Sequence, residues 1–194
     1  IQATAQLEGT TVELMKMGEP GVPEMNAYIE EVLKEGETLG FDGRVVSVGE
    51  GEGYAAIAGK KNAKVNYQVD LIDEIWEDRP VLSEEPAFNL DVKYAGETVA
   101  SKLARIREEM KEAGTNVHVV STLDDICWTL NIRGNDIDFF PLVLSYGIIT
   151  MDSFELYIDE RKLDDKLKAK LAKDGVNLHP YNDIYEDVKK FDSD

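Results

Sequence analysis

The chain has 194 residues and a formal net charge of −18, with 39 acidic against 21 basic side chains. Hydrophobic residues make up 43% of it, which is enough to fill the cores of one large or two small domains, so a disordered chain is not expected. Because so negative a surface repels phosphate groups and anionic lipids, nucleic acid and membrane surfaces are not expected partners.

The cysteine content and the apolar runs indicate an intracellular protein. Cys127 is the only cysteine, so no internal disulfide can form, and no CxxC pattern is present that would hold a structural zinc. The longest apolar runs fall short of the roughly 18 residues that a membrane-spanning helix needs. No charged-then-apolar leader opens the chain. We predict a cytoplasmic location, and the start at Ile1 leads us to expect a processed chain or a fragment.

Short strands and helices alternate in the first half of the chain. A stretch with two prolines and many charged side chains follows at 77–86, so we place a domain boundary near residue 87 and predict domains at 1–87 and 88–194. The elements predicted before this boundary are a strand at 11–17, a helix at 25–33, strands at 38–41 and 45–48, a helix with Tyr54, Ile57 and Ala58 on one side, a strand at 65–69 and a helix at 71–76.

The second half repeats the alternation and contains the clearest amphipathic helix, with Val99, Leu103, Ile106 and Met110 on one face. Thr122 with Asp125 three residues later resembles a capping box for the next helix. The other elements predicted here are a strand at 88–94, a strand at 117–120, a helix that buries Ile126, Trp128 and Leu130, strands at 139–150 and 154–158, and helices around 163–171 and 181–188.

Helices between strands favour an α/β fold, and the adjacent strand pair at 139–158 requires an antiparallel part. We therefore predict mixed sheets flanked by helices. The same element order in both halves suggests two related subdomains, although no residue-level repeat supports a duplication.

One glycine motif resembles a nucleotide-binding turn. Residues 51–56 match GxGxxA between a predicted strand and a predicted helix. Glu50 and Glu52 would lie where a pyrophosphate needs positive potential and backbone N–H groups. We therefore favour a plain glycine-rich turn over a dinucleotide site.

The two histidines do not form a recognisable catalytic group, because no HExxH, no GxSxG and no adjacent Cys–His pair is present. His118 alternates with valines inside a predicted strand, so a structural role is expected. His179 precedes Pro180 in a predicted loop, where a lone solvated imidazole is expected.

Two close carboxylate pairs and the cysteine are the other chemical candidates. Asp124 and Asp125 are expected to begin a helix, while Asp136 and Asp138 lie in a polar loop that lacks further calcium ligands. We therefore expect no metal site in this chain. Cys127 has no neighbouring base or cation that would lower its pKa, so we expect a small core residue. The residues alone indicate no catalytic site.

The stretch from Ser121 to Thr150 resembles the signature of the second domain of aminopeptidase P, in the creatinase/prolidase family. In that family a Leu-Asp-Glu-Ile-Ala-Trp-Leu-Leu-Asn-Leu-Arg-Gly-Ser-Asp run precedes Asn-Pro-Val-Phe and Ser-Tyr. The matching residues here are Leu123, Asp124, Ile126, Trp128, Leu130, Asn131, Arg133, Gly134, Asp136, Pro141, Val143, Ser145 and Tyr146. Further similar stretches are 14–18, 40–42, 69–80, 93–96, 102–105 and 179–181.

The resemblance implies creatinase N-terminal, ribonuclease H-like folds, with the end of domain one at 1–87 and domain two at 88–194. Full-length members of the family add a C-terminal catalytic domain with two divalent metals, often manganese. The resemblance implies that in the parent enzyme a water or hydroxide bridging the two metals would attack the peptide bond before proline. The resemblance places the metal ligands, two aspartates, one histidine and two glutamates, in that C-terminal domain, so we expect these 194 residues alone to be inactive, to hold no cofactor and to contain no catalytic residue.

The resemblance also implies that these N-terminal domains enclose the substrate cleft and help subunits associate. The expected partners are therefore the catalytic domain, Xaa-Pro peptides and a second copy of the protein. Arg133, Asn135, Asp136 and Tyr146 are candidates to face the cleft. Structural roles are the alternative, with Arg133 paired to Asp136 or Asp138 and Tyr146 packed in the sheet.

Two other functions stay open at this point. One is a freestanding module without enzymatic activity that binds peptides or basic proteins through its acidic surface. The other is a nucleotide-dependent enzyme that uses the turn at Gly51.

Overall fold

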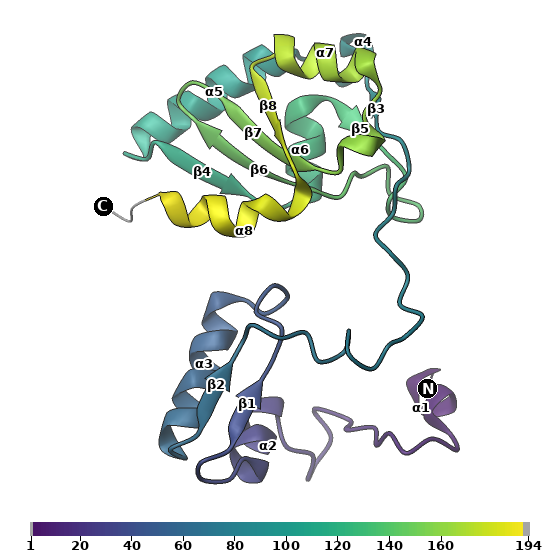
Figure 1. Cartoon of the computed structure of the whole chain (residues 1–194), viewed down its shortest axis with the longest axis vertical. Coiled ribbons are helices and arrows are strands. Elements are labelled where there is room, and N and C mark those ends of the chain that lie inside the picture. The colour runs from purple at the N-terminus through teal and green to yellow at the C-terminus, as the bar shows by residue number, and fades with distance from the viewer. Residues whose placement is uncertain (1, 192–194) are drawn as a thin grey trace. The chain divides into compact units, whose positions relative to one another are not determined.

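The computed structural model describes residues 2–191 (Figure 1) and divides between Pro80 and Val81 into two compact units. We call residues 2–80 the first unit and residues 81–191 the second unit. Ile1 and residues 192–194, which are the outer ends of the two predicted domains, lie outside the described residues. The boundary near residue 87 stays a prediction.

The first unit contains a short parallel strand pair packed against two helices (Figure 1). Its small core contains Leu33, Ile57 and Ala58, and Tyr54 is also buried, as the helical spacing predicted. Its elements are α1 (Gln2–Leu7), α2 (Met25–Val32), β1 (Thr38–Gly40), α3 (Val48–Lys60) and β2 (Lys64–Asn66).

Helix α3 begins earlier than the sequence predicted, and this changes the interpretation of the glycine motif. Ser47 is the N-cap of α3 and forms a capping box, in which its side chain accepts from Glu50 N and the Glu50 side chain accepts from Ser47 N. The predicted strand at 45–48 is therefore wrong. Gly51 and Gly53 lie inside α3, so GxGxxA forms neither a loop for a dinucleotide nor a glycine-rich turn.

Two other predicted elements of the first unit are wrong. Residues 12–16 form no strand and are exposed, because glycines and prolines after Met17 leave this segment without a partner strand. Residues 71–75 form turns instead of a helix. Asp70 Oδ1 accepts hydrogen bonds from the backbone N of Ile72 and of Asp73, and this side chain-to-backbone bonding competes with helix formation.

The second unit contains a four-stranded mixed sheet in the order β4-β6-β7-β8. The strands are β4 (Val117–Val120), β6 (Ser145–Thr150), β7 (Phe154–Ile158) and β8 (Val176–His179). The pairs β4–β6 and β6–β7 are antiparallel, while β8 runs parallel to β7. A turn of three residues suffices between β6 and β7, whereas the parallel pair needs the crossover helix α7 (Asp165–Lys173). The predicted mixed sheet flanked by helices is confirmed.

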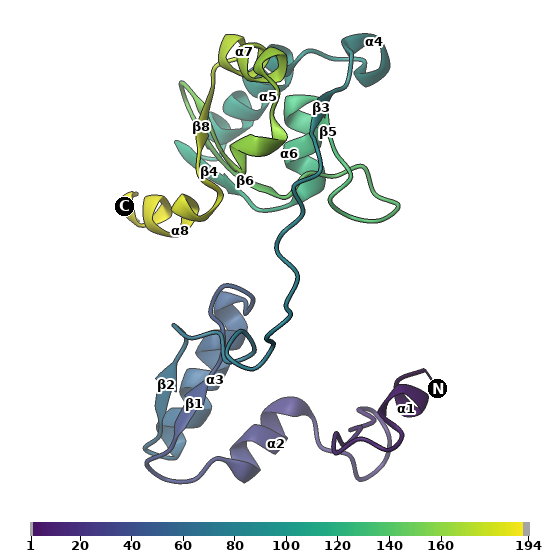
Figure 2. The same cartoon turned by 45° about the vertical axis from the view of Figure 1, so that its right-hand side comes forward.

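Side chains that alternate along β6 divide the interior of the second unit into two layers. Ile149 joins the main core, which is completed by α5 (Val99–Glu112), α6 (Leu123–Leu130) and α7. Ile148 points to the other face and packs with Tyr157 and Ile184. Figure 2 shows the helices around this sheet. The smaller elements are β3 (Phe88–Asn89), α4 (Val92–Ala95), β5 (Ile132–Arg133), η1 (Glu160–Lys162), η2 (Tyr181–Asp183), α8 (Ile184–Asp187) and η3 (Val188–Lys190).

Four local predictions for the second unit are corrected. The strand predicted at 88–94 is wrong beyond Asn89, because Asp91 caps helix α4, which occupies Val92–Ala95.

Thr122 is the N-cap of α6, but its side chain makes no capping hydrogen bond, so the predicted capping box does not form. Asp125 is also shorter than the Glu or Gln that would reach back to the backbone N–H of Thr122. Residues 139–144 do not extend β6, since Phe139 has a φ of 68° and Pro141 lacks an N–H.

The predicted burial of Trp128 is the fourth correction, because its side chain is 42% exposed. Helix α6 turns Ile126, Cys127 and Leu130 toward the core. At about 100° per residue, Trp128 then falls on the outer side of the helix. Its ring lies 4.3 Å from Lys102 Nζ and 5.8 Å from the Arg105 guanidinium carbon.

Gly147 allows β6 to pack closely against a ring of β7. A Cβ at this position would lie 2.6 Å from Phe154 Cζ and 3.7 Å from Ile126 Cγ1. We expect Gly147→Ala to lower the free energy of unfolding of the second unit by about 1–3 kcal/mol, because the added methyl overpacks the core. Urea denaturation measures this change.

The matched control is Gly49→Ala, at a glycine of α3 whose Cβ would meet no atom within 4 Å. Alanine is a better helix former than glycine, so this variant should raise the free energy of unfolding of the first unit by about 0.5–1 kcal/mol. An unchanged urea midpoint for Gly147→Ala would contradict the close approach to Phe154.

Candidate functional site

The loop between β5 and β6 carries two of the four predicted cleft residues, Asn135 and Asp136, and Arg133 ends β5 directly before it. We call residues 134–144 the 134–144 loop. A buried ion pair anchors it. The side chains of Asp136 and Lys162 are 0% and 2% exposed, and Lys162 Nζ lies 2.5 Å from Asp136 Oδ2. The same oxygen accepts a 2.6 Å hydrogen bond from Leu144 N. Asp136 therefore ties the start of the loop to its end and to η1.

Asp136 also contains the one buried side-chain oxygen or nitrogen within residues 2–191 that has no hydrogen-bond partner, namely Oδ1. Both strong contacts of the carboxylate use Oδ2. Because a buried carboxylate is stable only when its charge is compensated, the Lys162 ammonium carries this compensation.

The backbone of the 134–144 loop forms a narrow turn. Gly134 N donates to Pro141 O, and Phe140 N donates to Ile137 O at 3.1 Å. A Cβ on Gly134 would lie 2.8 Å from Val143 Cγ2, so the two ends of the loop approach too closely for a larger residue. At the tip, Phe139 is fully exposed and Phe140 is 60% exposed. The 134–144 loop therefore has a base that is held by close contacts and a tip whose apolar side chains are exposed.

Arg133 is half-buried and bonds to backbone carbonyl groups. Its Nη1 donates to Cys127 O and Ile132 O, each at 2.7 Å. The alternative of an ion pair with Asp136 or Asp138 is wrong, because the side chain turns back to α6 while Asp136 pairs with Lys162. A cation near the last carbonyls of a helix is favourable, so Arg133 stabilises the end of α6.

Lys102 stabilises the same helix end from α5 and is only 1% exposed. Its Nζ donates to Trp128 O at 2.6 Å and to Asn131 Oδ1 at 2.7 Å. Burial lowers the pKa of Lys102, against the opposing effect of the Glu97 carboxylate. Sequence reasoning missed this residue, although its spacing of three from Val99 placed it beside the apolar stripe of α5.

Tyr146, the fourth predicted cleft residue, lies on β6 within a group of tyrosines. Its hydroxyl is 3.1 Å from the Tyr185 hydroxyl, and its ring centroid is 5.1 Å from that of Tyr181. Burial and the hydroxyl of Tyr146 raise the pKa of Tyr181 above its ordinary value. The exposed Asn135 completes the predicted set. The orientation of these residues toward a cleft stays a prediction.

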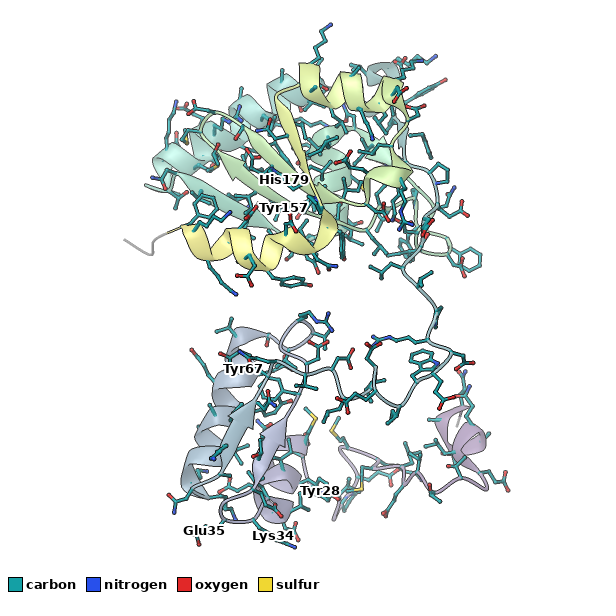
Figure 3. All side chains as sticks on the ribbon, viewed as in Figure 1. Tyr28, Lys34, Glu35, Tyr67, Tyr157 and His179 are labelled. Carbon is teal, nitrogen blue, oxygen red and sulfur yellow. The ribbon has the colours of Figure 1, made fainter. Side chains whose placement is uncertain are left out.

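His179 is not the solvated loop residue that the sequence predicted. It ends β8, whose parallel register places it beside Tyr157 of β7, and the two rings stack with centroids 4.9 Å apart (Figure 3). His179 Nε2 lies 2.6 Å from Glu155 Oε2. Burial acts to raise the pKa of Glu155, but hydrogen bonds from Ser153, His179 and Asn177 outweigh it and lower that pKa.

The remaining chemical candidates are dispersed. His118 lies on β4, and Asp124 and Asp125 lie in the first turn of α6. Cys127 is 1% exposed, which confirms the predicted core position, and burial raises the pKa of its thiol. Among residues 2–191, no group of three or more His, Cys, Asp or Glu side chains is arranged to hold a metal ion. No described helix is long and apolar enough to cross a membrane.

A cavity of about 610 Å³ lies within the second unit, between residues 81–84 and the ends of β7 and β8. Charged side chains form part of its lining. Arg161 pairs with Glu84 at 2.6 Å and with Asp159 at 2.5 Å, and all three line the cavity. The arrangement of these charges can be tested by titration.

We expect the Asp159 carboxyl to titrate with a pKa of about 2, chiefly because Arg161 donates hydrogen bonds to it. Since this pKa lies below the unfolded value, the stabilisation is present above the unfolded pKa and is lost as the pH falls through about 2. NMR titration of the Asp159 carboxyl measures the value. In Arg161→Met it should return toward its ordinary range, and an unchanged value in that variant would contradict the assigned cause.

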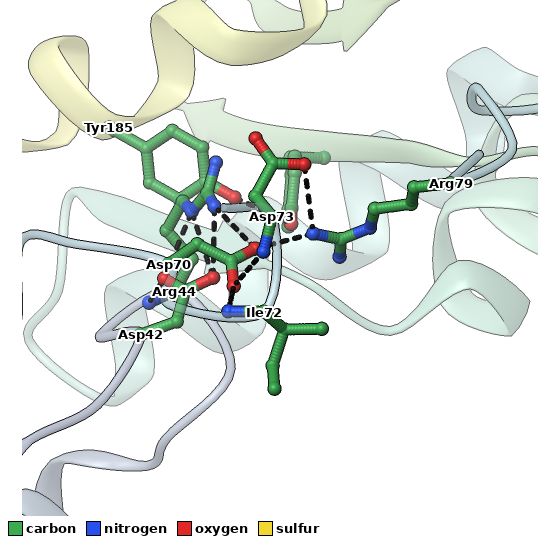
Figure 4. Close-up of polar contacts among 8 residues, drawn as sticks. Asp42, Arg44, Asp70, Ile72, Asp73, Arg79 and Tyr185 are labelled. Carbon is green, nitrogen blue, oxygen red and sulfur yellow. Dashed lines mark hydrogen bonds and ion pairs between the residues drawn. The ribbon is translucent and has the colours of Figure 1, made fainter. Parts of the chain in front are cut away.

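In the first unit, Asp70 organises the segment that resembled the aminopeptidase family. Its Oδ2 lies 2.6 Å from Arg79 Nη1 and 3.5 Å from Arg44 Nη2 (Figure 4). The hydrogen bond from Arg79 is the main cause that lowers the pKa of Asp70. Asp42 also pairs with Arg44. These contacts stabilise a turn and form no catalytic arrangement.

Comparison with known proteins connects this structure to a family. Residues 78–194 match the family model described as the creatinase/prolidase N-terminal domain. Aminopeptidase P2 of Arabidopsis thaliana is 37% identical over 191 residues, which cover 97% of this chain and 27% of that protein. Xaa-Pro aminopeptidase app-1 of Caenorhabditis elegans is 35% identical over 185 residues, which cover 95% of this chain and 30% of that protein.

A solved structure agrees with these matches. The crystal structure of X-prolyl aminopeptidase from Caenorhabditis elegans, described as a cytosolic enzyme with a di-nuclear active site, superposes with a TM-score of 0.89 at 34% identity. The superposition covers 97% of this chain and 31% of that chain. The chain thus spans less than a third of the length of these relatives.

Proposed function

The chain belongs to the creatinase/prolidase N-terminal domain family, and from this we propose that it is the non-catalytic N-terminal region of a metal-dependent Xaa-Pro aminopeptidase. The observation that carries the proposal is the match of nearly the whole chain, in sequence and in fold, to part of such enzymes. The parent enzyme would hydrolyse the bond after the N-terminal residue of peptides with proline in second position.

The described residues do not fit a dinuclear metal site, because no suitable group of ligands occurs among them. In this proposal, the two divalent metals, which we expect to be manganese, are held by residues of the catalytic domain of the parent. The di-nuclear active site of the Caenorhabditis elegans enzyme supports the expectation of two metals. The cytosolic description of that enzyme supports a cytoplasmic location for the parent.

We assign this region the tasks of shaping the substrate cleft and making subunit contacts, with the end of domain one at 1–87 and domain two at 88–194. Arg133 and Asp136 act in it as positioning residues, since Arg133 Nη1 donates to a carbonyl oxygen of α6 and Asp136 Oδ2 pairs with Lys162. Asn135 and Tyr146 are the candidates to approach a peptide. A homo-oligomer of the parent would use other surfaces of the same domains.

An activity assay tests the assignment of catalysis. The purified 194-residue chain, incubated with manganese and an Xaa-Pro peptide, should release no N-terminal residue. The full-length gene product should release it under the same conditions, and chelation should abolish that activity. Release by the 194-residue chain would overturn the proposal, as would an inactive full-length protein.

The net charge of −18 favours one other candidate, a freestanding module that binds peptides or basic proteins. Sequencing the gene past the codon for Asp194 separates the two functions. A reading frame that continues into a domain with two aspartates, a histidine and two glutamates supports the aminopeptidase. A stop codon directly after Asp194 supports the freestanding module.

A further inference from the structure

We propose that Phe139 and Phe140, at the tip of the 134–144 loop, dock into an apolar surface of the catalytic domain of the full-length protein. This inference rests on the proposed function and adds to it the residues through which the two parts meet.

The exposure of this tip is the first argument. Phe139 is fully exposed and Phe140 is 60% exposed, so two adjacent aromatic rings extend into solvent. A buried aromatic side chain removes about 150–250 Å² from water, so the pair offers a large gain on docking. Phe139 has a φ of 68°, a left-handed conformation that is unfavourable for an aromatic residue and that turns its ring outward.

The rigidity of the base is the second argument. The Asp136–Lys162 ion pair and the hydrogen bond from Leu144 N to Asp136 fix both ends of the loop. Within the tip, Phe140 N donates to Ile137 O, and these two residues form an isolated β-bridge. A preformed loop loses little conformational entropy when it binds, which is the property of a docking element.

The length of the relatives favours the catalytic domain as the partner that covers the tip of the 134–144 loop. This chain covers 27–31% of the length of its relatives, so in a protein of that length most of the polypeptide is available to cover the tip. A second copy is the less favourable occupant, because two chains of charge −18 repel each other and Asp138 directly precedes Phe139 in the sequence.

Thiol labelling of Phe139→Cys tests the proposal in the full-length protein. The native Cys127 is buried and should react slowly, so the introduced thiol dominates. In the 194-residue chain, F139C should react as fast as a control cysteine at the exposed Lys111 of α5, introduced as K111C. In the full-length protein, the labelling rate of F139C should fall by about tenfold or more, while the labelling rate of K111C should not change.

Each other outcome overturns the inference. Equal labelling of F139C in both proteins would show that the tip stays free. Slow labelling in the 194-residue chain would mean that this chain covers the tip itself. Protection that requires a high protein concentration would identify a second copy, and protection that requires an Xaa-Pro peptide would identify the substrate.

The activity of the full-length protein separates the two proposals. If it hydrolyses Xaa-Pro peptides but leaves F139C unprotected, the docking inference fails and the proposed function stands. If the gene product has no catalytic domain, both fail. A second variant, Phe140→Cys, repeats the measurement in case the first alters the turn, and thermal unfolding of the 194-residue variants checks that both still fold.

Discussion

Replacing Lys162 by methionine should lower the free energy of unfolding of the second unit by about 3–5 kcal/mol. The ammonium of Lys162 lies 2.5 Å from Asp136 Oδ2, and both side chains are almost fully buried. Without it, Asp136 is left as an uncompensated charge in the interior, with Oδ1 already unpartnered. Urea denaturation followed by Trp128 fluorescence in a Trp76→Phe background reports this unit separately.

Two controls identify the ion pair as the cause. The double variant Lys162→Met/Asp136→Asn removes both charges but keeps an acceptor for Leu144 N, so it should be more stable than Lys162→Met alone. Lys111→Met breaks the exposed pair with Glu108 and should leave the urea midpoint unchanged. A double variant that is less stable than the single one would contradict the explanation.

The second large effect is expected at Lys102. Lys102→Met should lower the free energy of unfolding of the second unit by about 2–4 kcal/mol. The reason is that Trp128 O and Asn131 Oδ1 would lose the charged, buried donor that now binds them. The end of α6 and the following β5 depend on this contact, since Asn131 is the left-handed C-cap of α6. Far-UV circular dichroism during urea denaturation measures the change without depending on Trp128.

The matched control for this variant is Lys93→Met, at an exposed lysine of α4. It removes the same charge without burial, so no change in the midpoint is expected. If both variants behaved alike, the hydrogen bonds of Lys102 would not support the helix end. Loss of stability only in Lys102→Met would also explain why a lysine lies beside the apolar stripe of α5.

Several elements were predictable because their signals are local. The spacing of Val99, Leu103 and Met110 identified α5 and its buried face, and the apolar runs on both sides of Met151 and Asp152 identified the β6–β7 hairpin. Such patterns depend only on the period of a helix or strand. The resemblance to the aminopeptidase family used identities along the chain, and the family match confirms it.

The candidate site was predictable only in part. Asn135 and Asp136 were identified with the loop that carries them, and Arg133 with the strand end before it, but the partners of Arg133 and Asp136 were not. Asp136 pairs with Lys162, 26 positions away, and Arg133 binds carbonyl groups of α6. A sequence shows that a side chain carries charge, whereas its partner depends on which segments meet.

The sequence by itself determined the α/β class, the main amphipathic helix, the hairpin and the family, because these follow from periodicity and residue identity. The tertiary structure decided which charges are buried, that His179 stacks on Tyr157, that Trp128 is exposed, and that Phe139 and Phe140 protrude from an anchored loop. The physical reason is that burial and pairing depend on contacts between distant segments, and the free energy of a charge or an aromatic ring is set by those contacts.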